Sequence, residues 1–214
     1  MLPAMVMASS FALCSIPSTD SKRRMPVGVW GSMANMTDTP VVVMGLMGAG
    51  KSTVARLLAA ALDRPMRDSD ADLEARYGTT AAVIAADLGP DELHAREALV
   101  LRDALTDDRS PVIAAAASTV EDPETRNALA PAFVVFLDGP PEVLAERMKS
   151  SPHRPHFKPD LVRMLTEQRD LRLPGFQEVA DLTLDPAAHT PEEIADAVLA
   201  HLDGARISGA SEKR

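Results

Sequence analysis

The sequence contains very few cysteine and aromatic residues. Cys14 is the single cysteine among 214 residues, which excludes an intrachain disulfide and a cysteine-based metal site. So low a cysteine content is typical of a reducing compartment, and we expect a cytoplasmic location. Aromatic residues make up 3% of the chain, and its 46% hydrophobic content is mostly alanine, leucine and valine. This composition favours helices packed on a sheet over an aromatic-rich β-sandwich.

The sequence also lacks a long apolar run and a concentrated stretch of positive charge. No apolar segment approaches the roughly 20 residues of a membrane-spanning helix. A signal peptide carries basic residues before its apolar core, whereas Lys22-Arg23-Arg24 follows the first apolar stretch. The net charge is −9 and no stripe of lysine and arginine forms, which argues against a nucleic-acid duplex as partner. We therefore expect neither a membrane nor a nucleic acid as partner, and the sequence leaves the oligomeric state open.

The two ends of the chain differ from its middle in composition. Residues 1–38 hold six methionines mixed with serine, proline and short apolar pieces, without a sustained period. We interpret this segment as the result of a start codon assigned upstream of Met33 or Met36, with a disordered leader as the alternative. Residues 204–214 are small and polar, and we expect a disordered tail there. The sequence thus predicts one domain, residues 39–203.

The most informative segment reads Gly45-Leu-Met-Gly-Ala-Gly-Lys-Ser52 and matches the phosphate-binding pattern G-x-x-x-x-G-K-S. A short apolar strand precedes it and a helix-forming run follows, so backbone N–H groups and the positive end of a helix dipole point at one spot. A glycine-rich turn with an incidental lysine is the alternative, and the complete spacing argues against it. Lys51 is expected to reach the β- and γ-phosphates, and Ser52 to bind Mg²⁺. The predicted nucleotide-binding residues of this segment are Gly45, Gly48, Ala49, Gly50, Lys51, Ser52 and Thr53.

Strand and helix patterns alternate along the predicted domain. Apolar runs predict strands at 41–44, 65–68, 111–115, 133–137 and 182–184. Helical patterns lie at 51–62, 71–77, 80–86, 91–105, 123–129, 140–149, 159–172 and 191–202. This alternation predicts an α/β fold with three layers, in which helices flank a five-stranded parallel sheet and ligands bind at the carboxyl ends of the strands. Together with the phosphate-binding segment, it indicates a P-loop fold that binds phosphate.

Two carboxylates, Asp68 and Asp70, stand at the end of the second predicted strand, beside the expected nucleotide site. One can bind Mg²⁺ directly or through water, and the other can accept a proton from a substrate hydroxyl. Asp70 could instead cap the next helix, because aspartate is a favoured N-cap residue. Capping and catalysis are compatible, and we expect both carboxylates to serve the reaction.

A proline-rich connection at about 150–160 joins two predicted helices and contains Arg154. Long loops over nucleotide sites often close as lids that exclude water. Arg154 is therefore expected to neutralise charge on the transferring phosphoryl group, with an ordinary surface arginine as the alternative. His153 and His156 lie in the same segment without a nearby carboxylate or cysteine in sequence, so we expect solvated lid residues rather than metal ligands.

With these motifs, residues 40–202 resemble the shikimate kinase family of P-loop proteins. The resemblance is carried by the phosphate-binding segment, Asp68-Ser-Asp70, Leu137-Asp-Gly-Pro-Pro, Arg154-Pro and the segment 172–185. It implies a P-loop kinase fold with a lid, ATP as the phosphoryl donor and a small-molecule hydroxyl as the acceptor.

The resemblance also implies roles for single residues. Asp68, with Ser52, would belong to the Mg²⁺ site, and Asp70 would contact the acceptor hydroxyl. Arg172 would pair with a carboxylate of the substrate, and Arg147 would pack against adenine. For Arg147 an ordinary place on the helix surface is the alternative.

The expected acceptor site departs from the family at two places. The family carries three glycines after its third strand, where this chain has Ala116-Ala117-Ser118. Side chains there fill space beside the substrate and disfavour positive φ by about 1 kcal/mol. The family's second carboxylate-binding arginine corresponds to His94, which lacks a bidentate guanidinium. His94 and Ala117 thus join Asp70 and Arg172 as predicted substrate contacts in a modified site.

Three functions agree with these features. We favour an ATP-dependent small-molecule kinase that phosphorylates a polyol or cyclitol hydroxyl, with Lys51, Asp70 and Arg154 as catalytic residues. Loss of one bidentate contact, worth about 1.5–3 kcal/mol, would weaken binding of shikimate about ten- to a hundredfold. The second function is a true shikimate kinase that tolerates both changes. The third is a nucleotide-binding protein without transfer activity, and the presence of Asp70 and Arg154 argues against it, because binding alone needs neither.

Overall fold

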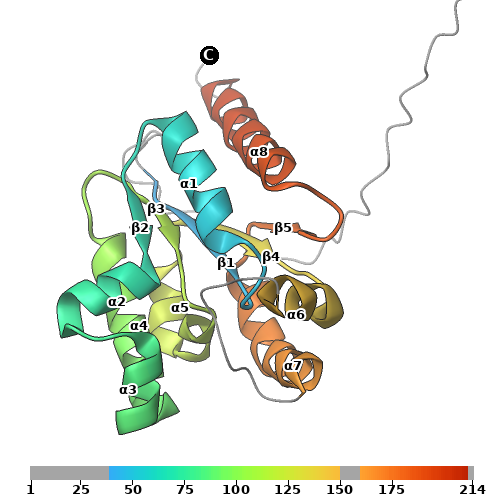
Figure 1. The fold of residues 1–214 in the computed structure, drawn as a ribbon. Coiled ribbons are helices and arrows are strands. Elements are labelled where there is room, and N and C mark those ends of the chain that lie inside the picture. Colours follow the sequence, from blue (N-terminus) through green and yellow to red (C-terminus); the bar gives the residue numbers. More distant parts are fainter. Residues whose placement is uncertain (1–38, 150–159, 212–214) are drawn as a thin grey trace, which may run out of the picture. The chain divides into compact units, whose positions relative to one another are not determined.

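The structure is a computed structural model that describes residues 39–149 and 160–211, with side chains described through residue 203 (Figure 1). The described residues belong to one compact unit, Ala34–Arg214. The segment expected to be a leader, 1–38, lies outside the described residues. So do Arg154 and residues 150–159 of the predicted lid.

Five parallel strands form one sheet in the order β2-β3-β1-β4-β5, which confirms the predicted parallel sheet. The strands are β1 (Val41–Gly45), β2 (Met66–Asp68), β3 (Val112–Ala114), β4 (Phe133–Leu137) and β5 (Leu182–Leu184). Strand β1 is central, with Val43 opposite Ala114 of β3 and Gly45 opposite Leu137 of β4. Every residue of β1, β3 and β4 is buried, because helices cover both faces of a parallel sheet.

Helices connect the strands and form the outer layers, and α1 packs beside α8 (Figure 1). The helices are α1 (Lys51–Leu62), α2 (Ser69–Tyr77), α3 (Ala81–Leu88), α4 (Pro90–Leu105), the 3₁₀ helix η2 (Ala117–Glu121), α5 (Pro123–Ala128), α6 (Pro141–Lys149), α7 (Leu161–Val179) and α8 (Pro191–Ser211). The predicted end of the last helix at residue 202 was wrong, since α8 continues to Ser211 through most of the segment expected to be a disordered tail. None of the helices in the described part of the chain is long and apolar enough to cross a membrane.

Helix α7 continues past residue 172, where the sequence predicted its end. Pro174 lies inside the helix, where a proline costs about 3 kcal/mol. Packing of the following turn offsets this cost. Phe176 is fully buried, and its ring stacks on that of Phe136 with centroids 4.4 Å apart. Gly175 allows α7 to approach η2 closely, because a Cβ there would lie 2.8 Å from the carbonyl oxygen of Val120.

We expect Gly175→Ala to lower the free energy of unfolding by about 1–3 kcal/mol, because the added methyl group would overlap the Val120 carbonyl. Chemical denaturation would measure the change. Leu171→Ala is the matched control on the same helix, since Leu171 is 66% exposed and should change stability by less than about 0.5 kcal/mol. Equal stability of Gly175→Ala and the unmodified protein would show that α7 and η2 do not pack in this way.

Candidate active site

The loop between β1 and α1 lies at the carboxyl end of the central strand. Its three glycines, Gly45, Gly48 and Gly50, have φ values of 145°, 83° and 89°. A Cβ at Gly45 would lie 2.6 Å from the Leu137 carbonyl oxygen, and one at Gly48 would lie 2.7 Å from that of Leu144. The first two glycines therefore let the loop pack on β4 and α6. Gly50 faces open space and is the N-cap of α1 without a side-chain hydrogen bond.

The start of α1 combines backbone N–H groups with a lysine. Gly50 has no side chain that could accept hydrogen bonds from the N–H groups in the first turn of α1. These N–H groups can therefore donate to an anion such as a phosphate. Lys51 Nζ donates to the carbonyl oxygen of Leu46 at 3.2 Å and thus lies across the loop. Ser52 and Thr53 are exposed in the first turn. Ala49 is buried, and its N–H donates to Leu46 O at 3.3 Å, so this residue shapes the loop from within.

The acidic pair follows β2 directly. Asp68 Oδ1 accepts a hydrogen bond from the N–H of Asp70 at 3.1 Å and caps α2. The N-cap role considered for Asp70 was therefore wrong, because α2 begins at Ser69 and Asp68 is the cap. Ser69 is buried, and its Oγ accepts from the N–H of Ala116 at 3.2 Å. This bond joins the end of β2 to the turn after β3, while Asp70 is exposed beside it.

The turn after β3 needs no positive φ. Ala116 has φ −64° and ψ 144°, and half-buried Ala117 begins η2. The strain expected from side chains at these positions was therefore wrong, since the backbone takes a conformation that any residue adopts. Ser118 is buried and donates its hydroxyl to Glu97 Oε2, a contact that a glycine would not offer.

Glu97 lies one turn after His94 on α4 and is 8% exposed. Burial raises the pKa of the Glu97 carboxyl above its usual value, while the hydrogen bond from Ser118 and the charge of His94 lower it. The negative charge of Asp70 raises this pKa further, and the positive charge of Arg172 lowers it. Charges act on one another in this way only at short range. Asp70, His94 and Arg172 thus all act on the charge of Glu97.

Arg172 already has an acidic partner. It is 7% exposed, and its Nε donates to Glu121 Oε1 at 2.6 Å. The other carboxylate oxygen of Glu121, Oε2, lies 3.8 Å from His94 Nδ1. Glu121 ends η2 and belongs to no motif, so sequence reasoning missed it. The packing of η2 on α4 and α7 is what places it between the two predicted substrate contacts.

Arg147, predicted to pack against adenine, lies in the last turn of α6, the helix on which Gly48 of the phosphate-binding loop packs. Its Nη2 donates to the carbonyl oxygen of Pro186 at 2.6 Å, in the connection between β5 and α8. This bond positions the guanidinium between α6 and that connection. A planar guanidinium held there can stack on a flat base, and contact with adenine stays a prediction.

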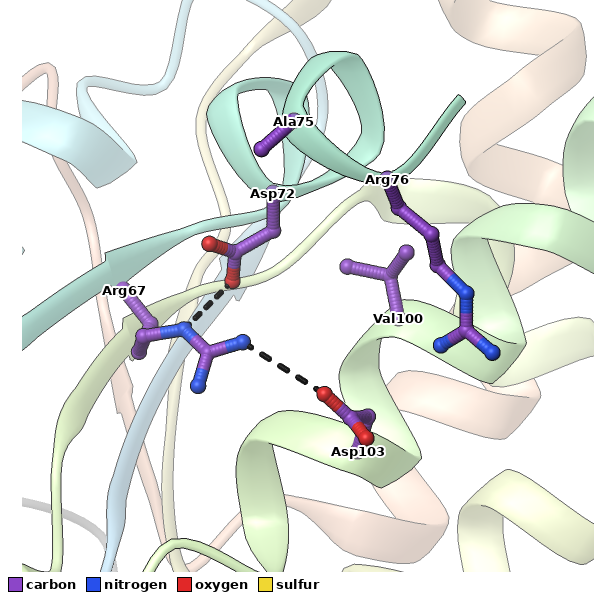
Figure 2. A pocket seen from close by; sticks show the side chains of 6 residues that line it. All are labelled: Arg67, Asp72, Ala75, Arg76, Val100 and Asp103. Carbon is purple, nitrogen blue, oxygen red and sulfur yellow. Dashed lines mark hydrogen bonds and ion pairs between the residues drawn. The ribbon is translucent and has the colours of Figure 1, made fainter. Parts of the chain in front are cut away.

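A pocket of about 370 Å³ opens between β2, α2 and α4 (Figure 2). It is lined by Arg67, Asp72, Ala75, Arg76, Val100 and Asp103. Arg67 Nε lies 2.6 Å from Asp72 Oδ2, and its Nη2 lies 3.7 Å from Asp103 Oδ2. Successive side chains of a strand point to opposite faces, so Arg67 and Asp68 point in opposite directions. Neither Asp68 nor Asp70 lines the pocket, and its paired charges join β2 to the two helices.

A phosphate-binding loop after the central strand of a parallel sheet, with an acidic pair at the end of another strand, defines a P-loop kinase for small molecules. Comparison with known proteins agrees. The family model described as shikimate kinase matches residues 47–203. The chain belongs to the shikimate kinase family.

Individual relatives support the family and the fold. A shikimate kinase of Frankia casuarinae is 36% identical over 172 residues, which cover 80% of this chain and 76% of the relative. The structure of shikimate kinase from Acinetobacter baumannii in complex with shikimate has a TM-score of 0.70 and 29% identity, covering 77% of this chain and 93% of that one. A gluconokinase from Sinorhizobium meliloti has a TM-score of 0.58 and 26% identity, covering 83% and 99%. The predicted P-loop kinase fold and small-molecule kinase class are confirmed.

Proposed function

We propose that the protein transfers the γ-phosphate of ATP to a hydroxyl of a small polyhydroxylated metabolite in the cytoplasm. The observation that carries the proposal is the shared placement of the phosphate-binding loop and the acidic pair at the carboxyl ends of parallel strands. Ser69 anchors the acidic pair to the turn after β3. Asp70 is exposed directly after Ser69, and its charge acts on Glu97.

The donor side of the site would bind ATP through the loop and the start of α1. Lys51, now bonded to Leu46 O, would turn to the β- and γ-phosphates. The Ser52 hydroxyl and the Asp68 carboxylate are oxygen donors of the kind that Mg²⁺ prefers. Within residues 39–149 and 160–203 no three His, Cys, Asp or Glu side chains form a metal-binding group, so phosphate oxygens and water would supply the other ligands. When bound, Mg²⁺ would neutralise phosphate charge.

The acceptor side would use Asp70 as the general base. The acceptor hydroxyl donates its hydrogen bond to the Asp70 carboxylate, which takes the proton as the hydroxyl oxygen bonds to the γ-phosphorus. The bond from the γ-phosphorus to the β-phosphate oxygen breaks, and ADP leaves. We propose that Arg154 of the lid stabilises charge on the moving phosphoryl group and that Arg147 packs on adenine.

We expect saturable ADP release with at least one compound of a panel of shikimate, gluconate and inositol-like cyclitols, and little release with nucleoside monophosphates. The reason is that the predicted acceptor residues suit hydroxyl groups rather than a second nucleotide. A coupled assay with each compound at fixed Mg-ATP measures the rates. Tight ATP binding without turnover of any compound would contradict the proposal and favour a silent nucleotide-binding protein.

True shikimate kinase activity is the second candidate. Family membership favours it, as does the similarity to a structure solved with shikimate. Turnover of shikimate at ordinary enzyme rates, about 1–10³ s⁻¹, would establish it over the first candidate.

A further inference from the structure

The residues around the predicted acceptor position carry an excess of negative charge. We define the acceptor cluster as Asp70, His94, Glu97, Glu121 and Arg172. It holds three carboxyl groups and one guanidinium, and His94 adds a positive charge only when it is protonated. Even with Glu97 neutral, since burial raises its pKa, the carboxylates of Asp70 and Glu121 outnumber the guanidinium of Arg172. An anionic ligand entering this cluster therefore meets more repulsion than attraction from the described side chains.

The geometry of Glu121 strengthens this effect. Its Oε1 accepts from the buried Arg172 Nε at 2.6 Å, and its Oε2 lies 3.8 Å from His94 Nδ1. The two carboxylate oxygens thus face both groups of the cluster that could hold an anion. A charge-assisted hydrogen bond to a guanidinium is strong. An incoming carboxylate would compete with Glu121 for Arg172 and would lie close to the negative charge of Glu121.

We propose that Glu121 determines the acceptor specificity, so that this kinase takes a polyhydroxylated acceptor without a carboxylate. The inference rests on the proposed function and names its substrate class. A neutral acceptor can donate hydroxyl hydrogens to the carboxylates of the cluster, whereas an ionised carboxylate has no hydrogen to donate. Glu121 also balances the positive charge of Arg172, so Arg172 needs no anionic group of the acceptor as a partner.

A matched pair of acceptors tests this directly. Shikimate and its carboxamide have the same hydroxyl groups. They differ only in that the first carries a charged carboxylate and the second a neutral amide. The ratio of kcat/KM for the acid to that for the amide, measured by ADP release, should be one or less in the unmodified protein. In Glu121→Gln and Glu121→Ala it should rise about ten- to a hundredfold, because Arg172 becomes available to the acid. The alanine variant is included because glutamine could still accept from Arg172.

Glu124→Gln is the charge-matched control, since its side chain is 81% exposed on the following helix, and its ratio should equal that of the unmodified protein. The Kd for Mg-ATP and the melting temperature of each variant show that the fold and the donor site are intact. A preference for the acid in the unmodified protein, or an unchanged ratio in both Glu121 variants with turnover retained, would overturn the inference alone. Absence of turnover of these two acceptors and of every compound of the panel, in all proteins and despite ATP binding, would overturn the proposed function and the inference with it.

Discussion

Lys51→Ala should reduce kcat/KM for ATP by about 10²–10³-fold or more. The ammonium group lies across the phosphate-binding loop on the Leu46 carbonyl, at the start of α1. Its positive charge is placed to meet the β- and γ-phosphates, where charge builds up during transfer. Calorimetric titration with Mg-ATP measures the loss of binding, and the ADP-release assay measures the loss of turnover. Both binding and turnover should fall, since the same charge serves the ground state and the transition state.

Lys149→Ala provides the control for Lys51. Lys149 lies on the surface of α6, where its Nζ is 3.3 Å from Glu146 and its side chain is 63% exposed. Surface ion pairs of this kind contribute little, so this variant should bind ATP normally. If Lys51→Ala kept normal kinetics, the loop would serve the fold and not the nucleotide.

Asp70→Asn should reduce kcat by about 10²–10⁴-fold and leave the affinity for ATP near normal. The change removes the proton acceptor and keeps the size of the side chain. Asp68 would still cap α2, because its Oδ1 bonds to the backbone N–H of residue 70 and not to the side chain. Single-turnover kinetics separates the chemical step from binding, and titration with Mg-ATP tests the donor site.

Asp91→Asn is the control for Asp70, because Asp91 is an exposed aspartate in the first turn of α4. It should leave kcat unchanged. Weaker Mg-ATP binding in Asp70→Asn without a loss of kcat would mean that Asp68 and Asp70 have exchanged their proposed roles. The proton acceptor would then have to be sought at Asp68.

The donor half of the site could be predicted closely because it is local. The glycines, lysine and serine of the loop are contiguous in the chain, and their positive φ values follow from what glycine permits. The strands at 133–137 and 182–184 were predicted to the residue, since short apolar runs between turn signals leave few alternatives. Helix α7 was predicted too short because Pro174 stops a helix by local rules. The stacking of Phe176 on Phe136, far away in the chain, overrides them.

The acceptor half could be predicted only in part. The resemblance predicted Asp70, His94 and Arg172 as substrate contacts, and these roles stay predictions. In the structure Glu121 lies between His94 and Arg172. Neither the bond from Arg172 to Glu121 nor that from Ala116 to Ser69 carries a sequence signal, because each joins residues about 50 positions apart. Such contacts arise only when distant elements pack together, α7 with η2 in the first case and the start of α2 with the turn after β3 in the second.

The sequence by itself determined the phosphate-binding loop, the alternation of strands and helices, and the place of the acidic pair after β2. These depend on residue spacing and on the conformations open to a few neighbouring residues. Tertiary structure alone decided the strand order and the pairing of Glu121 with Arg172. Both depend on which segments, distant in the chain, come into contact. The charge that an acceptor meets is likewise a sum over side chains from separate helices, which no single segment of the sequence determines.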